Sequence, residues 1–305
     1  MQTKLGQMDQ ATGFKAERLG VWSREYPFPI DRERIQAYAE ATTDRLPPHI
    51  SGNLAPPVFA VVPAFEALTA ALTSILPNRE LLTLALHGQH DFRYHLPITP
   101  GMTVVSRATA LGFRNRSSGA TTLIKATTQE QGSGAVLVEQ YMTTFFRGVN
   151  SENAGESAPE HKLDEDLRQS APVAELTQTF DEDQTFRYAA ASGDPMLIHL
   201  DEKVARSVGL PGIIIHGLCT MAFNSVAVIG QACAGDPTRL KRLAVRFSRP
   251  VQPGQTITTR VWEAGEGRDT AATYAFETTA DSGDVVTTDG RADVARAPNP
   301  RRRYQ

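Results

Sequence analysis

The sequence predicts an α+β protein built from two similar copies, each a curved antiparallel sheet wrapped around one long central helix. Three observations predict this fold. The 305 residues contain an internal repeat. Each half carries one long apolar segment, and in each half that segment is followed by Thr- and Val-rich runs separated by Gly, Pro and Asp. Because the chain is about twice the length of a typical domain of ~150 residues, each copy can bury a core of its own.

The repeat consists of identical residues at a nearly constant offset. Residues 31–49 (DRERIQAYAEATTDRLPPH) and 181–199 (DEDQTFRYAAASGDPMLIH) share six identities at an offset of 150. The identical pairs are Asp31/Asp181, Tyr38/Tyr188, Ala39/Ala189, Ala41/Ala191, Asp44/Asp194 and His49/His199. Residues 90–112 and 243–265 continue the repeat at an offset of 153. A short loop insertion accounts for the change of offset.

The elements of the second copy follow in a clear order. Asp181 and Gln184 resemble an N-terminal capping box, which predicts a short helix that ends at Ser192, before Gly193. After a loop, the pattern predicts a second short helix at 201–208 and a central helix at 213–232. Four strands are expected after the central helix, at 243–250, 256–264, 271–280 and 284–295. The first copy repeats this order, with a central helix at 58–76 and four strands at 82–95, 102–111, 120–129 and 136–148.

Domain boundaries follow from composition. Residues 150–172 are polar and acidic with almost no apolar periodicity, which predicts a linker between the copies. The linker separates a first domain at 1–149 from a second domain at 173–296, and residues 297–305 are expected to be a solvated tail.

Composition and charge exclude several classes of protein. A net charge of −3 and a pI near 6.2 give no basic surface for nucleic acid. Two cysteines, Cys219 and Cys233, form neither a disulfide framework nor a zinc pattern and are expected to be buried thiols. The first 20 residues lack the apolar core of a secretion signal, so we expect a cytoplasmic protein.

One segment resembles a membrane span by charge alone. Ser207–Gly235 contains no Asp, Glu, Lys or Arg. Pro211, His216, Asn224 and several glycines interrupt it, so we expect a helix buried inside the domain and no membrane partner.

The second copy also carries a motif that resembles a known family. Its parts are Tyr188, Ser192-Gly193-Asp194, Ile198-His199 and His216-Gly217, and the segment APPVF at 55–59 matches a feature of the same family. The chain, over roughly residues 20–295, is similar to the MaoC-like (hydratase 2 type) enoyl-thioester hydratases and dehydratases in their double hot dog form.

The resemblance implies reversible addition of water to a trans-2-enoyl thioester of coenzyme A or acyl carrier protein, which gives a (3R)-hydroxyacyl thioester without a cofactor or a metal. It implies Asp194 and His199 as the catalytic pair and the backbone N–H of Gly217 as the donor to the thioester oxygen. The supporting residues it implies are Ser192, Gly193 and His216.

These residue types suit that chemistry. A water molecule that adds to an enoyl thioester needs a nearby base, a proton source and donors at the thioester oxygen. His199 has an ordinary pKa near 6.5, and burial raises the pKa of a carboxyl such as Asp194 towards neutrality. The first N–H groups of a helix that starts at Gly217 have no partner within the helix.

The sequence departs from the family pattern in two places. Met196-Leu197 stands where the family has Asn-Pro, which leaves the orientation of the catalytic loop to packing and backbone bonds. The first copy keeps Asp44 and His49 but lacks the Ser-Gly and His-Gly pairs, so we expect that half to shape an acyl tunnel rather than to form a second active site.

Other assignments stay open at this level. Arg246 and Arg249 are candidates for phosphate contacts and equally for exposed strand arginines. His87, His90 and His95 are poorly spaced for zinc, and no metal is expected. A hot dog thioesterase or a non-catalytic acyl-thioester binding module are the alternative functions. The repeat allows either a monomeric double hot dog or a homodimer.

Overall fold

The strands of both copies join in one continuous antiparallel sheet. The computed structural model describes residues 13–266 and 272–296. Within these ranges, eleven strands run in the order β1-β3-β4-β5-β2-β8-β11-β10-β9-β7, with the short strand β6 paired to β3. Their bounds are β1 Tyr26–Pro29, β2 Ala85–Tyr94, β3 Thr103–Arg116, β4 Gly119–Glu130, β5 Val136–Arg147, β6 Ala154–Gly155, β7 Ala174–Thr179, β8 Leu240–Phe247, β9 Thr256–Gly265, β10 Ala272–Ala280 and β11 Val285–Val294.

The two copies are related by an approximate two-fold axis at the β2–β8 junction. The strand order of the second copy mirrors that of the first across this junction. Asp91 of β2 lies opposite Ala244 of β8, and these residues are equivalent at the offset of 153. The hydroxyls of Tyr38 and Tyr188, equivalent at the offset of 150, lie 3.3 Å apart. The predicted α+β fold, in which two similar copies each contribute antiparallel strands and helices, is therefore confirmed.

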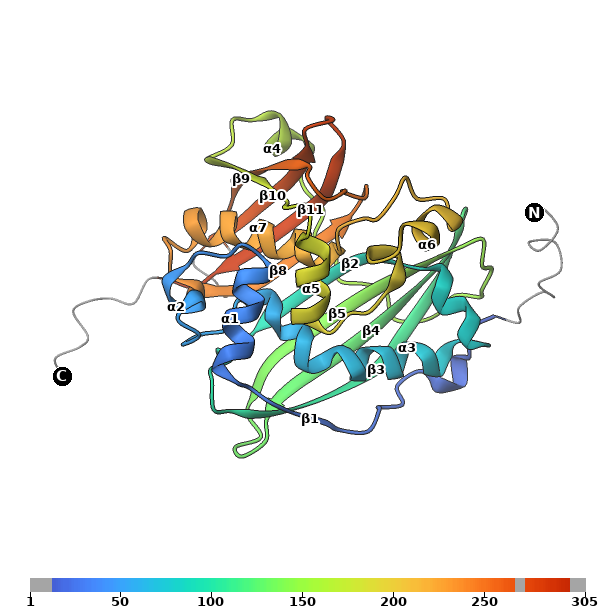
Figure 1. Cartoon of the computed structure of the whole chain (residues 1–305). Helices are drawn as coiled ribbons and strands as arrows, with labels where there is room; N and C mark the ends of the chain where they lie inside the picture. The colour runs from blue at the N-terminus through green and yellow to red at the C-terminus, as the bar shows by residue number, and fades with distance from the viewer. Residues whose placement is uncertain (1–12, 267–271, 297–305) are drawn as a thin grey trace.

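Most of the helices lie on one face of this sheet (Figure 1), whereas the short helix at Glu165–Gln169 packs on the opposite face, where Leu167 contacts the cluster of Leu163 and Trp262. The α-helices are α1 Arg32–Ala41, α2 Pro47–Ile50, α3 Phe65–Ile75, α4 Glu165–Gln169, α5 Gln184–Ser192, α6 Glu202–Ser207 and α7 Gly217–Ala232. The 3₁₀ helices are η1 Ala16–Arg18, η2 Pro57–Ala64, η3 Arg79–Leu84, η4 Leu197–His199 and η5 Pro237–Arg239. Cys219 and Cys233 are buried and free, as the sequence predicts.

The central helix of the first copy differs from the single helix expected at 58–76. It is divided into the 3₁₀ helix η2 and the α-helix α3. Pro63 lies inside η2 and has no N–H to donate, so an α-helical ladder is interrupted there. In the second copy, α7 begins at Gly217, four residues later than expected, because residues 213–216 are not helical.

Among the described residues, the segment Pro57–Ile75 is the one that is long and apolar enough to cross a membrane, with a mean hydropathy of 1.8. In the fold, 67% of that window is buried against the rest of the protein. The core helix of a globular domain has the same properties, so this stretch carries no argument for a membrane partner.

The segment at 150–172 connects the copies but is anchored to both. The guanidinium of Arg114 donates to the carbonyl oxygens of Ala154 (2.7 Å) and Gly155 (2.6 Å). Further along, Leu163 packs against Trp262 of the second copy. The strands β1, β6 and β7 and helix α4 were not expected, because each is too short for a periodic pattern. The predicted tail at 297–305 lies outside the described residues.

Candidate active site

A tight turn after α5 places Asp194. Gly193 ends the helix with φ +79°, a left-handed conformation that glycine adopts without strain. The backbone N–H of Asp194 donates to Ser192 Oγ at 3.2 Å, and the Asp194 carboxylate accepts from the backbone N–H of Met196 at 3.1 Å. These two bonds orient the loop, so the loop that contains Met196-Leu197 holds its carboxylate through backbone groups.

His199 follows on η4, and its ring is fixed by one backbone carbonyl. Nδ1 donates to the oxygen of Ile214 at 2.8 Å. The proton of the neutral ring therefore lies on Nδ1, and Nε2 carries a free lone pair.

His216, the residue before α7, packs directly on His199. The two rings are stacked with centroids 3.8 Å apart and planes 23° apart. The Thr185 hydroxyl donates to the carbonyl of His199 at 3.0 Å, so it accepts from Nδ1 of His216 at 3.1 Å. Nε2 of His216 is buried and has no hydrogen-bond partner among the described residues.

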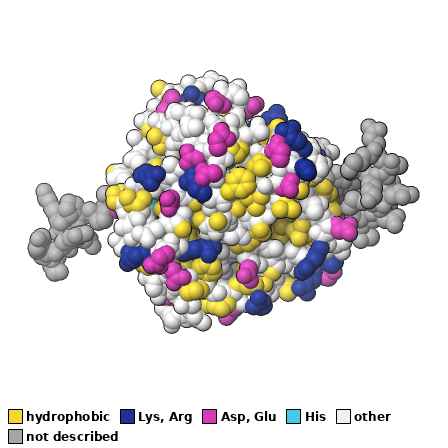
Figure 2. Space-filling view, viewed as in Figure 1, with side chains coloured by type: hydrophobic (Ala, Val, Ile, Leu, Met, Phe, Trp, Pro, Cys, Tyr) yellow, Lys and Arg dark blue, Asp and Glu magenta, His cyan; other side chains and the backbone are white. Residues whose placement is uncertain are grey.

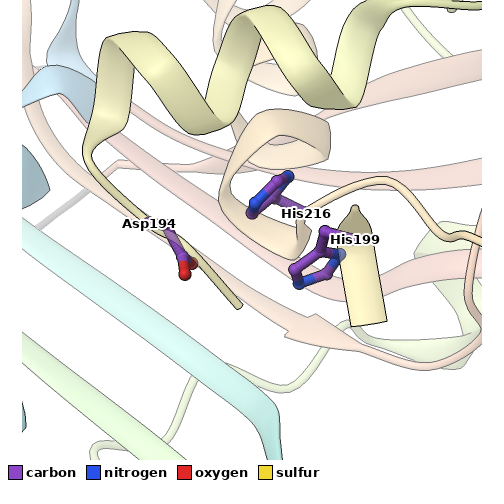
Figure 3. Close-up of side chains that lie close together, drawn as sticks. All are labelled: Asp194, His199 and His216. Carbon is purple, nitrogen blue, oxygen red and sulfur yellow. The ribbon is translucent and has the colours of Figure 1, made fainter. Parts of the chain in front are cut away.

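These three side chains form one cluster. One ligand atom from each of Asp194, His199 and His216 lies within 4.8 Å of the others, and Figure 3 shows the side chains converging from the loop after α5, from η4 and from the start of α7. Two groups that each bond one water molecule at about 2.8 Å are at most about 5.6 Å apart. A single water molecule can therefore bridge the carboxylate and an imidazole nitrogen.

Burial sets the protonation states of the cluster. Desolvation raises the pKa of the Asp194 carboxyl above its ordinary value. Desolvation lowers the pKa of His199 to about 4 and that of His216 to about 2. Both imidazoles are therefore neutral at neutral pH, and Nε2 of His199 is available to accept a proton.

The same cluster contains the residue types of a metal site. The donor atoms of a tetrahedral zinc ion, at bond lengths of 2.0–2.1 Å, are about 3.4 Å apart. The donor atoms of this cluster lie within 4.8 Å of one another, a wider limit than that spacing. The cluster therefore fits a bridging water better than a first coordination shell.

Gly217 opens α7 beside this cluster. The first N–H groups of a helix lack partners within it, and the His216 side chain does not cap them. A Cβ at Gly217 would lie 3.3 Å from the ring carbons of Phe247. Glycine is thus the residue that allows the ring and the helix start to approach so closely, and its amide lies next to the acid–base cluster.

The equivalent pair in the first copy is closed. Nδ1 of His49 lies 2.6 Å from Oδ2 of Asp44, and both side chains are almost fully buried. The Asp44 carboxylate also accepts from the backbone N–H of Leu46 at 2.9 Å. A direct bond leaves no space for a water molecule between the two groups, whereas the pair in the second copy is open.

The predicted arginines lie away from the cluster. Arg246 is followed by Phe247, and successive residues of a strand point to opposite faces, so Arg246 faces away from Gly217. Its guanidinium lies 3.6 Å from the Asp289 carboxylate. Arg249 is exposed just beyond β8. Phosphate contacts by these two residues stay a prediction.

Sequence patterns missed the contribution of strand β2 to this region. The pairing of β2 with β5 shifts between His87 and Gln89, so Gly88 forms a bulge. The bulge brings His87 and His90 to one face, where Nε2 of His87 lies 3.1 Å from Nδ1 of His90. A glycine inside a strand pattern is a bulge signal, and it was the available clue.

Two family descriptions match the chain, one in each copy. The MFE-2 hydratase 2 N-terminal domain matches residues 51–148, and the MaoC like domain matches residues 162–285. Among solved structures, a MaoC-like dehydratase from Phytophthora capsici superposes with a TM-score of 0.77 at 23% identity, over 92% of this chain and 98% of that one. A Mycobacterium tuberculosis protein described as a double hot dog fold superposes with a TM-score of 0.57 at 12% identity, over 89% of this chain and 95% of that one.

The chain is also similar to named sequences from several organisms. It is 30% identical to a probable enoyl-CoA hydratase 2 of Dictyostelium discoideum over 59% of this chain and 61% of that protein. It is 29% identical to the peroxisomal enoyl-CoA hydratase 2 of Arabidopsis thaliana over 68% and 69%, and 27% identical to the 3-hydroxyacyl-thioester dehydratase Y of M. tuberculosis over 78% and 80%. The match thus spans about three fifths to four fifths of these relatives.

The sheet, the two central helices and the loop with its Asp and His define a double hot dog protein. The chain belongs to the MaoC-like family of hydratase 2 type, with a hydratase 2 N-terminal domain in its first half and a MaoC-like domain in its second.

Proposed function

We propose that the protein is a hydro-lyase that adds water to trans-2-enoyl thioesters, or removes it from (3R)-hydroxyacyl thioesters. The observation that carries this proposal is the open Asp194–His199 pair beside the start of α7. Three of the similar proteins bear names of this reaction type.

The acid–base step follows from the positions of these groups. The Asp194 carboxylate and Nε2 of His199 accept hydrogen bonds from one water molecule, and the pair takes one of its protons as the oxygen bonds to the β-carbon. The electrons of the C=C bond move towards the thioester oxygen, which the N–H of Gly217 stabilises. The pair returns the proton to the α-carbon, so the net change is addition of one H₂O. Because one pair serves one water molecule, both new bonds form on the same face.

The roles of the other residues form part of the same proposal. Ser192 and Gly193 shape the turn that holds the carboxylate, and His216 packs on the catalytic imidazole. The closed Asp44–His49 pair supports a first copy that shapes the acyl tunnel and does not catalyse the reaction. The β2–β8 pairing within one chain supports a functional monomer, with a homodimer as the alternative.

The substrate handle is coenzyme A or an acyl carrier protein in this proposal. Leu197 and Phe186, on the catalytic loop and the helix before it, are apolar and about half exposed, with 55% and 48% of their surfaces accessible. Hydrophobic, acidic and basic side chains are mixed on the face that carries the helices (Figure 2). The cytoplasm is the expected compartment, although the Arabidopsis relative is named peroxisomal.

The test is turnover of purified protein on enoyl-CoAs of increasing chain length. We expect loss of the conjugated thioester absorbance, formation of the (3R) alcohol by chiral analysis, and no release of free thiol. Thiol release would instead identify a thioesterase. Tight acyl-CoA binding without turnover at any chain length would contradict the proposal and favour a binding module.

A further inference from the structure

A chain of hydrogen bonds on strand β2 of the first copy leads towards the site of the second copy. Nε2 of Gln140 donates to the carbonyl of Ala60 at 3.0 Å, and Oε1 of Gln140 lies 3.1 Å from Nε2 of His90. Nδ1 of His90 lies 3.1 Å from Nε2 of His87. The chain therefore runs from the η2 helix through Gln140 and His90 to His87.

The first bond fixes the direction of the others. Because the Gln140 amide nitrogen donates to Ala60, its oxygen must accept from Nε2–H of His90. A neutral His90 then has an unprotonated Nδ1, which accepts from Nε2–H of His87. Burial lowers the pKa of His90 well below its ordinary value and that of His87 to about 4, which keeps both rings neutral. Each proton in the chain thus has one defined position.

His87 connects this chain to the active site through Phe247. The two rings meet edge to face, with centroids 4.8 Å apart and planes 64° apart. The Phe247 ring also packs against Gly217, where a Cβ would lie 3.3 Å from its carbons. His87 also lies near enough to His199 that a positive charge on the His199 ring lowers the pKa of His87 further. A shift of His87 would therefore move the ring that defines the start of α7.

We infer that His87 and His90 are positioning residues for the second-copy site: they hold Phe247 against Gly217 and so fix the direction of the Gly217 N–H. This inference rests on the proposed function, in which that N–H binds the thioester oxygen. Because the N–H acts when charge develops on that oxygen, a misdirected donor lowers kcat more than it raises KM.

The experiment compares substitutions within the hydrogen-bond chain with one substitution outside it. His87→Leu keeps an apolar contact with Phe247 but removes the donor to His90, whereas His87→Gln retains an N–H near the position of Nε2. His95→Gln is the matched control, since His95 follows β2 and lies 3.2 Å from Glu139 at the surface, outside the chain. Gln140→Leu is a second variant, which removes the far end of the chain. Thermal unfolding verifies that each variant is folded.

We expect a 10- to 100-fold lower kcat for His87→Leu on an enoyl-CoA, with KM changed less than about 3-fold. His87→Gln should recover most of the lost rate, Gln140→Leu should lower kcat several-fold, and His95→Gln should match the wild type. Equal kcat in His87→Leu and the wild type, or equal losses in His87→Leu and His87→Gln, would overturn the inference.

A second measurement separates this inference from the proposed function. In ¹⁵N-glycine-labelled protein, the Gly217 amide signal, assigned by its loss in Gly217→Ala, should shift in His87→Leu and not in His95→Gln. A wild type without turnover would defeat the proposed function but leave this test intact. An unmoved Gly217 signal in His87→Leu would defeat the positioning role even in an active enzyme.

Discussion

The Asp–His pairs of the two copies predict opposite effects of the same substitution. Asp194→Asn removes a carboxylate whose pKa is raised by burial, so in the folded protein its charged form is less stable than in the unfolded chain. The carboxylate accepts one backbone hydrogen bond, which the Asn oxygen retains. We expect the free energy of unfolding at neutral pH to be unchanged or slightly higher, and kcat to fall by about 10²- to 10⁴-fold because the acid–base group is lost.

Asp44→Asn should have the reverse effect. The Asp44 carboxylate is about 1% exposed and accepts from both His49 and Leu46. Breaking a buried, hydrogen-bonded pair costs about 3 kcal/mol or more. At about 2–4 °C per kcal/mol for a protein of this size, the melting temperature should fall by roughly 6–12 °C. Turnover per folded molecule should stay within about 2-fold of the wild type, since this closed pair has no place for a substrate water.

Both variants are measured by initial rates on an enoyl-CoA and by urea unfolding at neutral pH. The reasoning requires a crossed result, with activity lost in one variant and stability lost in the other. Equal losses of activity in Asp44→Asn and Asp194→Asn would mean that the closed pair also takes part in catalysis. A large loss of stability in Asp194→Asn would refute the assignment of its carboxylate as a destabilising buried charge.

The remaining predictions concern pH, the helix start and metals. The rate should fall as the pH is lowered towards about 4, where His199 takes up a proton, and protonation of the Asp194 carboxylate, whose pKa burial raises, contributes to the same loss; a pH–rate profile measures this. The free energy of unfolding should also fall as the pH drops from about 6.5 to about 4, because in this range the unfolded chain binds protons that the folded chain does not. The loss should reach up to ~1.4 kcal/mol per pH unit for each of His199 and His216. Urea unfolding at pH 7 and pH 5 tests this, and His199→Asn should weaken the dependence of the unfolding free energy on pH. Gly217→Ala keeps the N–H but places a methyl group 3.3 Å from the Phe247 ring, which must shift by a few tenths of an ångström, so kcat should fall several-fold; an unchanged initial rate would argue that the packing of Phe247 on the helix start does not affect catalysis. A chelator should leave the rate unchanged if the Asp194 cluster binds water and not a metal, and rescue by added zinc would contradict this.

Long periodic segments were predictable because their patterns repeat several times. Each strand expected in the second copy overlaps one of β8 to β11, and the short helix expected to end at Ser192 does end there. The capping box is half formed: Asp181 N–H donates to Gln184 Oε1 at 3.2 Å, while the Asp181 carboxylate pairs with Arg187 instead of capping the helix. Nearby arginines compete for a carboxylate in ways that sequence spacing does not show.

The candidate site was predicted as residue types and not as distances. The sequence placed Asp194 and His199 in one loop, but the same spacing occurs in Asp44 and His49, which bond directly. In the second pair, Nδ1 of His199 donates to the carbonyl of Ile214 and is therefore not available for the direct bond to the carboxylate that Nδ1 of His49 makes in the first pair. Ile214 precedes α7 by three residues, and such a long-range contact has no periodic signal.

The duplicated sheet allows the two copies to differ: the Asp–His pair of the first copy is closed, while the pair of the second copy stays open. In a two-fold arrangement each copy borders the other at the β2–β8 junction, so groups of the first copy reach the second copy's site through His87 and Phe247. Thr43 stands where Gly193 ends α5, and it is held at φ +53°, a conformation that costs a β-branched residue about 1 kcal/mol or more. The closed pair at Asp44 supplies the bonds that hold this strained turn.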